Sequence, residues 1–453
     1  MDLYGALVRN VLYPAWEAGV KRRPTLRRLA ELRRLERAPA RELAAFQAEA
    51  LAALLRHAHD HVPFYRERME AAGVRPEEIR GPADLPRLPL LTRQEARASA
   101  ARRVSLAPPL PAIEKTTGGT TGEPLVIRYD LGSEYWRQAI KLRGFGWSGW
   151  RVGDPSLHYW GEYTRRVPLR QRAKQALDRA LRREHYVDCT PRDDHHKWRV
   201  VDLIRRVRPR AIFCYAQAGA ELARYINRTG LRTWDTIPVI CGAERVMPAD
   251  RAALEQAFGP AVFETYGCRE VMLIATECPE HDGLHLQVEN LVVELVGPDG
   301  QPVAPGEVGQ VVLTDLHNYG QPFIRYANGD LAIMKADEPC RCGRAHPRLA
   351  SVEGRQTETL RDSNGNPVGG MIFNLAFSPL AEAVRQFQAV QHADGSITVK
   401  VVPDGAGLPP GAVSHVEASC ARYLPGVQVR FESVPDIPPT AAGKRQVVVV
   451  ETA

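Results

Sequence analysis

Short β-rich runs alternate with helical segments along most of the chain after Pro111, and no other sequence feature restricts the possible fold as strongly. Leu125–Tyr129, Ala211–Tyr215 and Ile237–Ile240 are such runs, and a helical segment follows each of the last two. This alternation is typical of a mostly parallel sheet covered by helices, so we expect an α/β fold. The runs from Leu291 to Asp315 are shorter and separated by turns, which predicts an antiparallel β portion there.

The segment before this region is rich in Ala, Leu, Arg and Glu, and its leucines recur at helical spacing. Such spacing indicates amphipathic helices, so residues 1–110 are expected to be a helical lead-in. The leucines that carry the pattern are Leu29, Leu32, Leu35, Leu51, Leu54 and Leu55.

The segment after Gly354 has short strand-like and helical stretches that indicate a separate α+β unit of about 100 residues, within the usual range of domain sizes. We therefore predict an N-terminal core over 1–354, a hinge over 355–358 and a C-terminal domain over 359–453. The expected strands of the C-terminal domain are Ile397–Val402, Val427–Phe431 and Gln446–Glu451, and its expected helices are Pro379–Phe387 and Ala412–Tyr423.

Composition excludes several classes of protein. Apolar residues make up 44% and charged residues 25% of the chain, which is the globular average and excludes collagen-like and disordered chains. No apolar run is long enough to span a bilayer, and Met1–Tyr13 lacks the features of a secretory signal, so a cytoplasmic location is expected.

The net charge of +7 fits nucleic acid, an anionic membrane surface or phosphate-rich small substrates. The basic stretches Arg165–Arg183 and Arg205–Arg210 lack interleaved aromatic residues and a known binding module, so no nucleic-acid partner is expected. A solvated helix face is the simplest interpretation of these stretches. A docking surface for coenzyme A or for an acidic carrier protein is the alternative.

The stretch Thr116–Pro124 reads Thr-Thr-Gly-Gly-Thr-Thr-Gly-Glu-Pro and precedes a β-run. Glycines let a backbone approach an anion closely, and hydroxyl groups add hydrogen-bond donors, so this loop could wrap the phosphates of a nucleotide. It is not a Walker A loop, because the Gly-Lys-Ser/Thr ending is missing. Taken alone, the stretch fits an ordinary surface loop equally well.

The eight cysteines are too sparse for a disulfide framework, and three of them lie on two short knuckles. Cys278, His281, Cys340 and Cys342 supply three thiolates and one imidazole, a set suited to a structural Zn²⁺. His285 could replace His281 as the fourth ligand, and reduced, packed cysteines are the alternative to a metal site. The remaining cysteines are expected in the core: Cys189, Cys214, Cys241, Cys268 and Cys420.

The Thr/Gly-rich loop resembles the phosphate-binding signature of the adenylate-forming ligases, the acyl-CoA synthetases and their relatives. Later segments resemble further motifs of that superfamily in the same order, so the resemblance covers nearly the whole chain. The matching segments are Gly242–Glu244, Glu264–Glu270, Arg325–Asp330, Gly354-Arg355 and Thr440–Lys444.

Within the superfamily the chain resembles the phenylacetate–CoA ligase family. More narrowly, it resembles the branch of capsular-polysaccharide CapK-like or coenzyme F390 synthetase-like proteins. Three features carry this resemblance: the segment His57–Tyr65, Arg269 in place of a usual Ser or Thr, and Asp315–Tyr319 ahead of Arg325.

The resemblance implies how ATP would be held. Gly242, Ala243 and Glu244 would line the adenine pocket, Tyr266 with Gly267 would lie against the base, and the carboxylate of Asp330 would accept the ribose hydroxyls. The phosphate loop would hold the β- and γ-phosphates through Thr117, Gly118, Gly119, Thr120, Thr121 and Gly122.

The resemblance also implies the catalytic residues. Glu270 would carry Mg²⁺, a hard cation that prefers oxygen ligands. Arg355 would serve both ATP binding and catalysis, and Lys444 would reach between the carboxylate and the α-phosphate as a compact positive charge. A mobile C-terminal domain would swing Lys444 away between half-reactions. The expected acyl pocket takes in Trp160, Tyr215, Ala243 and Cys268.

The implied function is that of an AMP-forming carboxylate ligase. It would convert a carboxylic acid to an acyl-adenylate, release pyrophosphate and transfer the acyl group to coenzyme A. An amine, a hydroxyl or a carrier protein is the alternative acceptor, and a non-catalytic nucleotide-binding protein in polysaccharide assembly is a further alternative. The oligomeric state stays open, a dimer being compatible with the sequence.

The sequence departs from the family pattern at three places, of which the first would remove a positive charge near the triphosphate and the last concerns the acceptor. Glu123 stands where many relatives carry lysine, and Thr357 stands at the usual Asp of the hinge motif, where Glu358 could serve instead. Residues 362–367 differ from the pattern that helps to form the pantetheine tunnel, so the second half-reaction is the less defined one.

Overall fold

The structure is a computed structural model of the 453-residue chain. It describes residues 2–116, 125–161, 169–191, 193–297, 299–355, 359–365, 367–369, 373, 376–377, 380, 383–404, 410–438 and 446–451.

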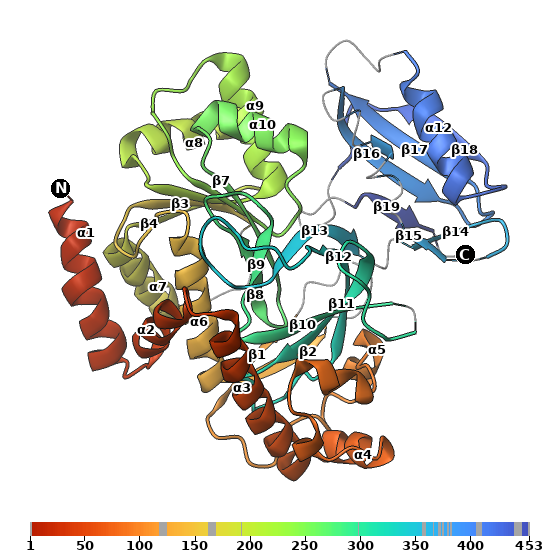
Figure 1. Ribbon diagram of the computed structural model, residues 1–453. Coiled ribbons are helices and arrows are strands. Elements are labelled where there is room, and N and C mark those ends of the chain that lie inside the picture. Colours follow the sequence, from red (N-terminus) through yellow and green to blue (C-terminus); the bar gives the residue numbers. More distant parts are fainter. Residues whose placement is uncertain are drawn as a thin grey trace.

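Eleven strands form the central sheet of the protein, in the order β10-β11-β12-β13-β9-β8-β7-β6-β5-β3-β4 (Figure 1). Strands β3 to β7 pair in parallel, in the order β4-β3-β5-β6-β7, and all other neighbours pair antiparallel. The parallel strands are Ser156–Trp160 (β3), Glu184–Asp188 (β4), Ala211–Tyr215 (β5), Val239–Gly242 (β6) and Val262–Cys268 (β7).

The parallel strands β5 and β6 are buried along their whole length because helices cover both of their faces. Ile212 packs into the cluster formed with the helices α8, α9 and α10, whereas its neighbour Phe213 packs on the opposite side with Trp136 of α6. Successive side chains of a strand point to opposite faces, which explains the unbroken apolar run. These helices are Leu131–Gly146 (α6), Asp194–Val207 (α8), Ala216–Thr229 (α9) and Pro248–Phe258 (α10), and Leu169–Arg182 (α7) follows β3.

The predicted α/β class is confirmed, but the antiparallel portion begins earlier than Leu291. It starts at β8, directly after β7, so that β7 pairs in parallel with β6 and antiparallel with β8. The antiparallel strands are Met272–Glu277 (β8), Leu284–Leu286 (β9), Leu291–Val296 (β10), Val308–Asp315 (β11), Tyr326–Met334 (β12) and Arg348–Arg355 (β13).

The N-terminal segment is helical, as the leucine spacing predicts. All six leucines of that pattern are buried, three in α2 and three in α3. Helix α2 packs along α6, and α3 and α4 pack over the β1–β2 hairpin region. The helices are Leu3–Leu7 (α1), Thr25–Leu35 (α2), Ala40–His61 (α3), Pro63–Ala71 (α4) and Arg93–Ala98 (α5), with π-helical segments at Val8–Leu12 and Ala15–Val20 and 3-10 turns at Pro76–Glu78 and Pro82–Arg87.

The hairpin of β1 (Ala112–Thr116) and β2 (Val126–Asp130) leads directly into α6, and Asp130 fixes this junction. Its carboxylate caps α6 by accepting a hydrogen bond from the Ser133 N–H at 3.0 Å. It also accepts the N–H groups of Tyr319 and Gly320 at 2.8 and 2.9 Å. One buried side chain therefore ties the helix start to the loop between β11 and β12.

The C-terminal residues form a small α+β unit with its own four-stranded sheet, in the order β18-β17-β16-β19. Val416 and Cys420 of α12 pack against Val399 and Val401 of β17, which gives this unit a separate apolar core. The helix expected over Pro379–Phe387 is wrong, because residues 384–387 begin β16. The elements are Thr359–Arg361 (β14), Pro367–Gly369 (β15), Val384–Gln391 (β16), Ile397–Pro403 (β17), Ala412–Tyr423 (α12), Val429–Ser433 (β18) and Val448–Val450 (β19).

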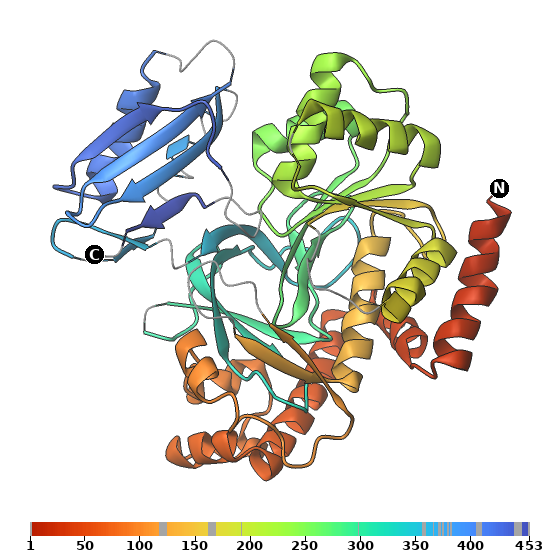
Figure 2. The same ribbon diagram turned by 180° about the vertical axis from the view of Figure 1, so that it is seen from behind.

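The C-terminal unit lies beside α9 and α10 and away from the N-terminal helices, as both views show (Figures 1 and 2). A cavity of about 70 Å³ lies between the two parts, with Gln217 and Asp250 on one side and Phe387 and Val447 on the other. Among the described helices, none is long and apolar enough to cross a membrane.

Candidate active site

The carboxyl ends of the neighbouring parallel strands β3, β5 and β6 bring together three of the predicted site residues. Strand β3 ends at Trp160, β5 at Tyr215 and β6 at Gly242. The rings of Trp160 and Tyr215 have centroids 4.3 Å apart. A Cβ atom on Gly242 would lie 3.2 Å from the Trp160 ring, so glycine allows this close packing. Ligands of open α/β sheets commonly bind at this edge, so the acyl pocket stays a prediction for this position.

The segment predicted to line the adenine pocket turns away from the sheet directly after β6. Ala243 has a φ of 68°, a left-handed conformation that is uncommon for a residue with a side chain. Glu244 then accepts a hydrogen bond from the backbone N–H of Gln217 at 3.2 Å, in the first turn of α9. The positive end of the α9 dipole favours a carboxylate at this position, so Glu244 fixes the turn after β6 to the start of α9.

A half-buried carboxyl group to which the sequence alone assigns no role lies next to this turn. Glu264 of β7 accepts a hydrogen bond from the Val246 N–H at 3.3 Å. Burial, together with the nearby charge of Glu277, raises the pKa of Glu264 to about 7. Arg251 forms an ion pair with Glu277 at 2.9 Å and not with Glu264.

Tyr266, Asn328 and Asp330 form a closed hydrogen-bonded trio between β7 and β12. The Tyr266 hydroxyl donates to Oδ2 of Asp330 at 2.7 Å. The Asn328 amide donates to that same oxygen at 2.7 Å and to the Tyr266 hydroxyl at 2.9 Å. Burial and the Asp330 charge raise the pKa of Tyr266 far above its ordinary value, so the hydroxyl remains a donor. The carboxylate of Asp330 is thereby held in one orientation.

Glu270 lies in the turn between β7 and β8 and is only 4% exposed. Its Oε1 accepts a hydrogen bond from the Tyr326 hydroxyl at 3.1 Å and faces the guanidinium of Arg93 at 3.5 Å. Burial and the charge of Glu270 raise the pKa of Tyr326, which keeps its hydroxyl protonated. A carboxylate oxygen is a suitable ligand for Mg²⁺, so Glu270 fits the predicted role chemically.

Three of these contacts come from residues to which the sequence analysis gave no role: Arg93, Tyr326 and Asn328. Tyr326 and Asn328 stand inside a recognised motif, which was the available signal for them. Arg93 lies far away in the sequence, on α5, and nothing in its surroundings marks it.

Gly267 and Cys268 close the β7–β8 turn. A Cβ atom on Gly267 would lie 2.1 Å from the carbonyl oxygen of Met272, so only glycine fits. Cys268 packs against the apolar cluster that includes Leu286 and Val311, and not with the Trp160–Tyr215 pair. Burial and the Glu270 charge raise the pKa of the Cys268 thiol well above its ordinary value, so it remains a protonated thiol.

A second group of side chains comes from the turn after β8, from β9 and from the loop between β12 and β13. The ligand atoms of Cys278, His285, Cys340 and Cys342 all lie within 4.8 Å of one another. The Cys278 and Cys340 sulfur atoms are 3.7 Å apart, and Nε2 of His285 is 3.5 Å from the Cys342 sulfur. Nδ1 of His285 lies 3.2 Å from the carbonyl oxygen of His346, an arrangement that leaves Nε2 available to a metal.

His281, predicted as the fourth ligand, lies outside this group. Its Nδ1 is 3.5 Å from Oε2 of Glu277, and its ring packs 4.9 Å from that of Phe263. The backbone of His281 is left-handed, with a φ of 48°, in the turn after Cys278. The structure therefore selects His285, the alternative left open by the sequence.

Several predicted site residues lie outside the described part of the chain: Thr117, Gly118, Gly119, Thr120, Thr121, Gly122 and Lys444. The backbone of Arg355 is described, and it lies opposite Asp330 in the β12–β13 ladder.

Comparison with known proteins adds a family to this geometry, although no protein-family model matches the chain. The chain is 30% identical over 375 residues to the phenylacetate–coenzyme A ligase of Thermus thermophilus, covering 80% of this chain and 81% of that protein. The chain belongs to the phenylacetate–CoA ligase family. The enzyme of the same name from Escherichia coli is 28% identical over 347 residues, with 72% and 74% covered.

Two solved structures of low sequence identity share the fold of this chain. A 2-hydroxyisobutyryl-CoA ligase in the postadenylation state superposes with a TM-score of 0.72 at 21% identity, covering 92% of this chain and 91% of that one. The amide bond synthetase McbA from Marinactinospora thermotolerans gives a TM-score of 0.50 at 18% identity, with 73% and 67% covered. As a phenylacetate–CoA ligase family member the protein is an AMP-forming ligase; membership of the CapK-like branch stays a prediction.

Proposed function

We propose that the protein activates a carboxylic acid with ATP and then transfers the acyl group to coenzyme A. In the first step a carboxylate oxygen attacks the α-phosphorus of ATP, a P–O bond forms, and the bond to the β-phosphate breaks, releasing pyrophosphate. In the second step the sulfur of coenzyme A attacks the acyl carbon, the C–O bond to the phosphate breaks and AMP leaves, while the thiol proton is lost to solvent.

The observation that carries the proposal is the buried trio of Tyr266, Asn328 and Asp330. Two donors converge on one oxygen of the Asp330 carboxylate, which fixes the direction in which it would accept the ribose hydroxyls of ATP. The orienting groups are in place before a substrate arrives, so little reorganisation is needed on binding.

The other residues would complete this site. Glu270, supported by Arg93 and Tyr326, would hold Mg²⁺, which supplies positive charge to the phosphates. Trp160 and Tyr215 would line the acyl pocket with aromatic surface. The Thr117–Gly122 loop would hold the phosphates, Arg355 would contact the nucleotide, and Lys444 would neutralise charge between the carboxylate and the α-phosphate.

An ATP–pyrophosphate exchange assay over a panel of carboxylic acids tests the first step. We expect exchange with at least one acid, lost in Lys444→Ala and retained in Lys400→Ala, a matched change on the C-terminal unit. No exchange with any acid, or full exchange in Lys444→Ala, would overturn the proposal.

The acceptor is tested separately, because the departures over residues 362–367 concern the second step. Mass spectrometry of the products, with and without coenzyme A, should show an acyl-CoA thioester and AMP. An acyl-adenylate that persists with coenzyme A but disappears with an amine, a hydroxyl compound or a carrier protein would favour those acceptors instead.

We also propose that Cys278, His285, Cys340 and Cys342 hold a structural Zn²⁺. Three thiolates and one imidazole fill a tetrahedral shell and leave no open position for chemistry. Strands β9 and β13 share only the pairs Arg348–His285 and Leu349–Leu284, so the metal would reinforce a short ladder. The His346 carbonyl near Nδ1 of His285 supports the required tautomer.

A further inference from the structure

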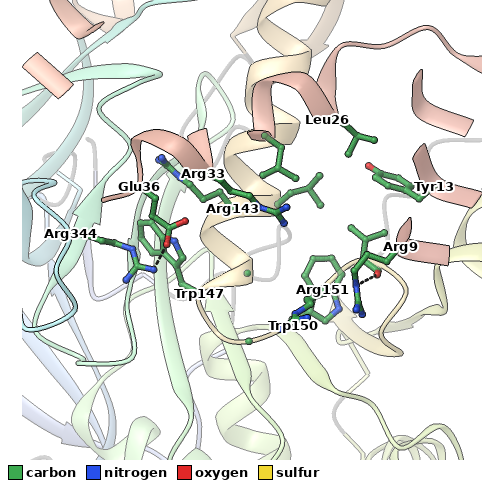
Figure 3. Close-up of a pocket in the computed structure, with 15 residues that line it drawn as sticks. Arg9, Tyr13, Leu26, Arg33, Glu36, Arg143, Trp147, Trp150, Arg151 and Arg344 are labelled. Carbon is green, nitrogen blue, oxygen red and sulfur yellow. Dashed lines mark hydrogen bonds and ion pairs between the residues drawn. The ribbon is translucent and has the colours of Figure 1, made fainter. Parts of the chain in front are cut away.

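A cavity of about 330 Å³ lies between the N-terminal helices and the end of α6, and no residue of the candidate active site lines it (Figure 3). Its volume is at the lower end of the range typical of small-molecule sites. The N-terminal segments contribute one set of apolar side chains, and the end of α6 with the following turn contributes another. These side chains are Tyr13, Leu26, Leu29, Leu142, Trp147 and Trp150.

The charged lining of this cavity is strongly basic, with five arginines against the single carboxylate of Glu36. Three of the arginines already have acidic partners: Arg9 pairs with Asp154, Arg143 with Glu289 and Arg344 with Glu36. The other two, Arg33 and Arg151, are exposed and form no ion pair with any residue that the structure describes. Two guanidinium groups therefore remain available to a ligand.

The side chains that line the cavity also include buried N–H donors without hydrogen-bond acceptors. Nε1 of Trp147, Nε1 of Trp150, Nε of Arg143 and Nε of Arg344 are buried and have no acceptor among the described residues. All four are N–H donors, and no lining side chain leaves a buried oxygen without a partner in that part of the chain. Buried polar groups are nearly always paired in proteins, so the missing partner is an acceptor.

We propose that this cavity binds a small organic carboxylate with an aromatic or aliphatic body, at a site separate from the catalytic one. The carboxylate would pair with Arg33 or Arg151, since a guanidinium group matches a carboxylate in both charge and geometry. The apolar body would lie against Trp147, Trp150 and Tyr13. Inorganic phosphate has the charge but lacks the body, so it would leave the apolar walls in contact with water.

Isothermal titration of the full-length protein with 4-phenylbutyrate, its neutral amide and inorganic phosphate tests the charge requirement. We expect saturable binding of 4-phenylbutyrate and none of the amide. The double variant Arg33→Ala/Arg151→Ala should bind 4-phenylbutyrate at least about tenfold more weakly than the wild type does. The control Arg75→Ala, which removes an exposed arginine elsewhere, should bind normally.

A second variant tests the cavity itself while keeping every charge. Gly146 lines the cavity at the end of α6, and a Cβ atom there meets nothing within 4 Å. Gly146→Leu should therefore fill the space, abolish this binding and leave the melting temperature unchanged or higher.

The outcomes separate the new site from the acyl pocket. Binding that is at least tenfold weaker in Arg33→Ala/Arg151→Ala and lost in Gly146→Leu supports the proposal. A second binding event that neither variant changes would belong to the acyl pocket. Binding of 4-phenylbutyrate that both variants leave unchanged would overturn it, as would equal affinity for the amide, equal affinity for phosphate, or no binding at millimolar concentration.

Discussion

Tyr266→Phe removes one oxygen atom and tests whether the buried trio orients Asp330 for nucleotide binding. The lost hydroxyl donates to the Asp330 carboxylate at 2.7 Å and accepts from Asn328 at 2.9 Å. A hydrogen bond to a charged group contributes about 1.5–3 kcal/mol, so ATP binding should weaken by roughly 10- to 100-fold. Because Asn328 still holds the same carboxylate oxygen, the lower end of that range is expected.

The assay is ATP–pyrophosphate exchange with the best acid from the panel, measured as a function of ATP concentration. Tyr266→Phe should raise KM for ATP about tenfold, with a smaller change in kcat and in KM for the acid. Asp330→Ala should lose more, and Tyr186→Phe, an exposed tyrosine on β4, should behave as wild type.

An unchanged KM for ATP in Tyr266→Phe, beside a large increase in Asp330→Ala, would refute the positioning role of Tyr266. An unchanged KM in both variants would refute the assignment of the trio to the nucleotide. A parallel loss of melting temperature and kcat, without a change in KM, would mean that the trio is only structural.

Three further predictions concern the surrounding structure. Protein purified without chelator should contain about one zinc per chain, lost in Cys340→Ser. Glu289→Gln should lower the free energy of unfolding by about 3–5 kcal/mol, because it leaves the buried guanidinium of Arg143 without its counter-charge. Stability should fall by up to about 3 kcal/mol as the pH rises from 4.5 to 7.5, because folding raises the pKa of Glu264 to about 7 and the folded state holds its proton longer; Glu264→Gln should flatten that slope.

Matched controls accompany these measurements. Cys420→Ser, in the C-terminal unit, should keep its zinc. Glu70→Gln, at an exposed carboxylate that forms no ion pair with the described residues, should denature at the same urea concentration as wild type. A metal-free protein of full stability, an undisturbed Glu289→Gln, or a pH slope that survives Glu264→Gln would each count against the corresponding argument.

Local patterns predicted the helices and the parallel strands well, because their residues satisfy periodicity and burial at once. Leu29, Leu32 and Leu35 are buried on one helix, and Ala211–Tyr215 is a fully buried strand. The helix expected at Pro379–Phe387 is wrong because Val384–Gln391 pairs with β17 along its length and its last three residues also pair with β19. Both partner strands follow later in the sequence, so the residues of 379–387 alone do not indicate this pairing.

In the candidate site, too, local motifs predicted some residues, whereas others could be found only from the fold. Tyr266, Glu270 and Asp330 could be named because each lies in a recognisable motif. The contribution of Arg93 depends on α5 packing beside the β7–β8 turn, which no spacing reveals. The choice between His281 and His285 also required the fold, since only the latter lies on β9 next to the knuckle of Cys340 and Cys342.

Strand β7 pairs in parallel on one side and antiparallel on the other, which separates two kinds of recognition within one sheet. Under the proposed function, the acid would be recognised by Trp160 and Tyr215 in the parallel half. Asp330, the carboxylate proposed to accept the ribose hydroxyls, and its neighbour Asn328 belong to the antiparallel half. Substitutions at the ends of β3 and β5 could thus alter the choice of acid while the nucleotide contacts stay intact, so divergence of substrate range in this fold need not compromise its use of ATP.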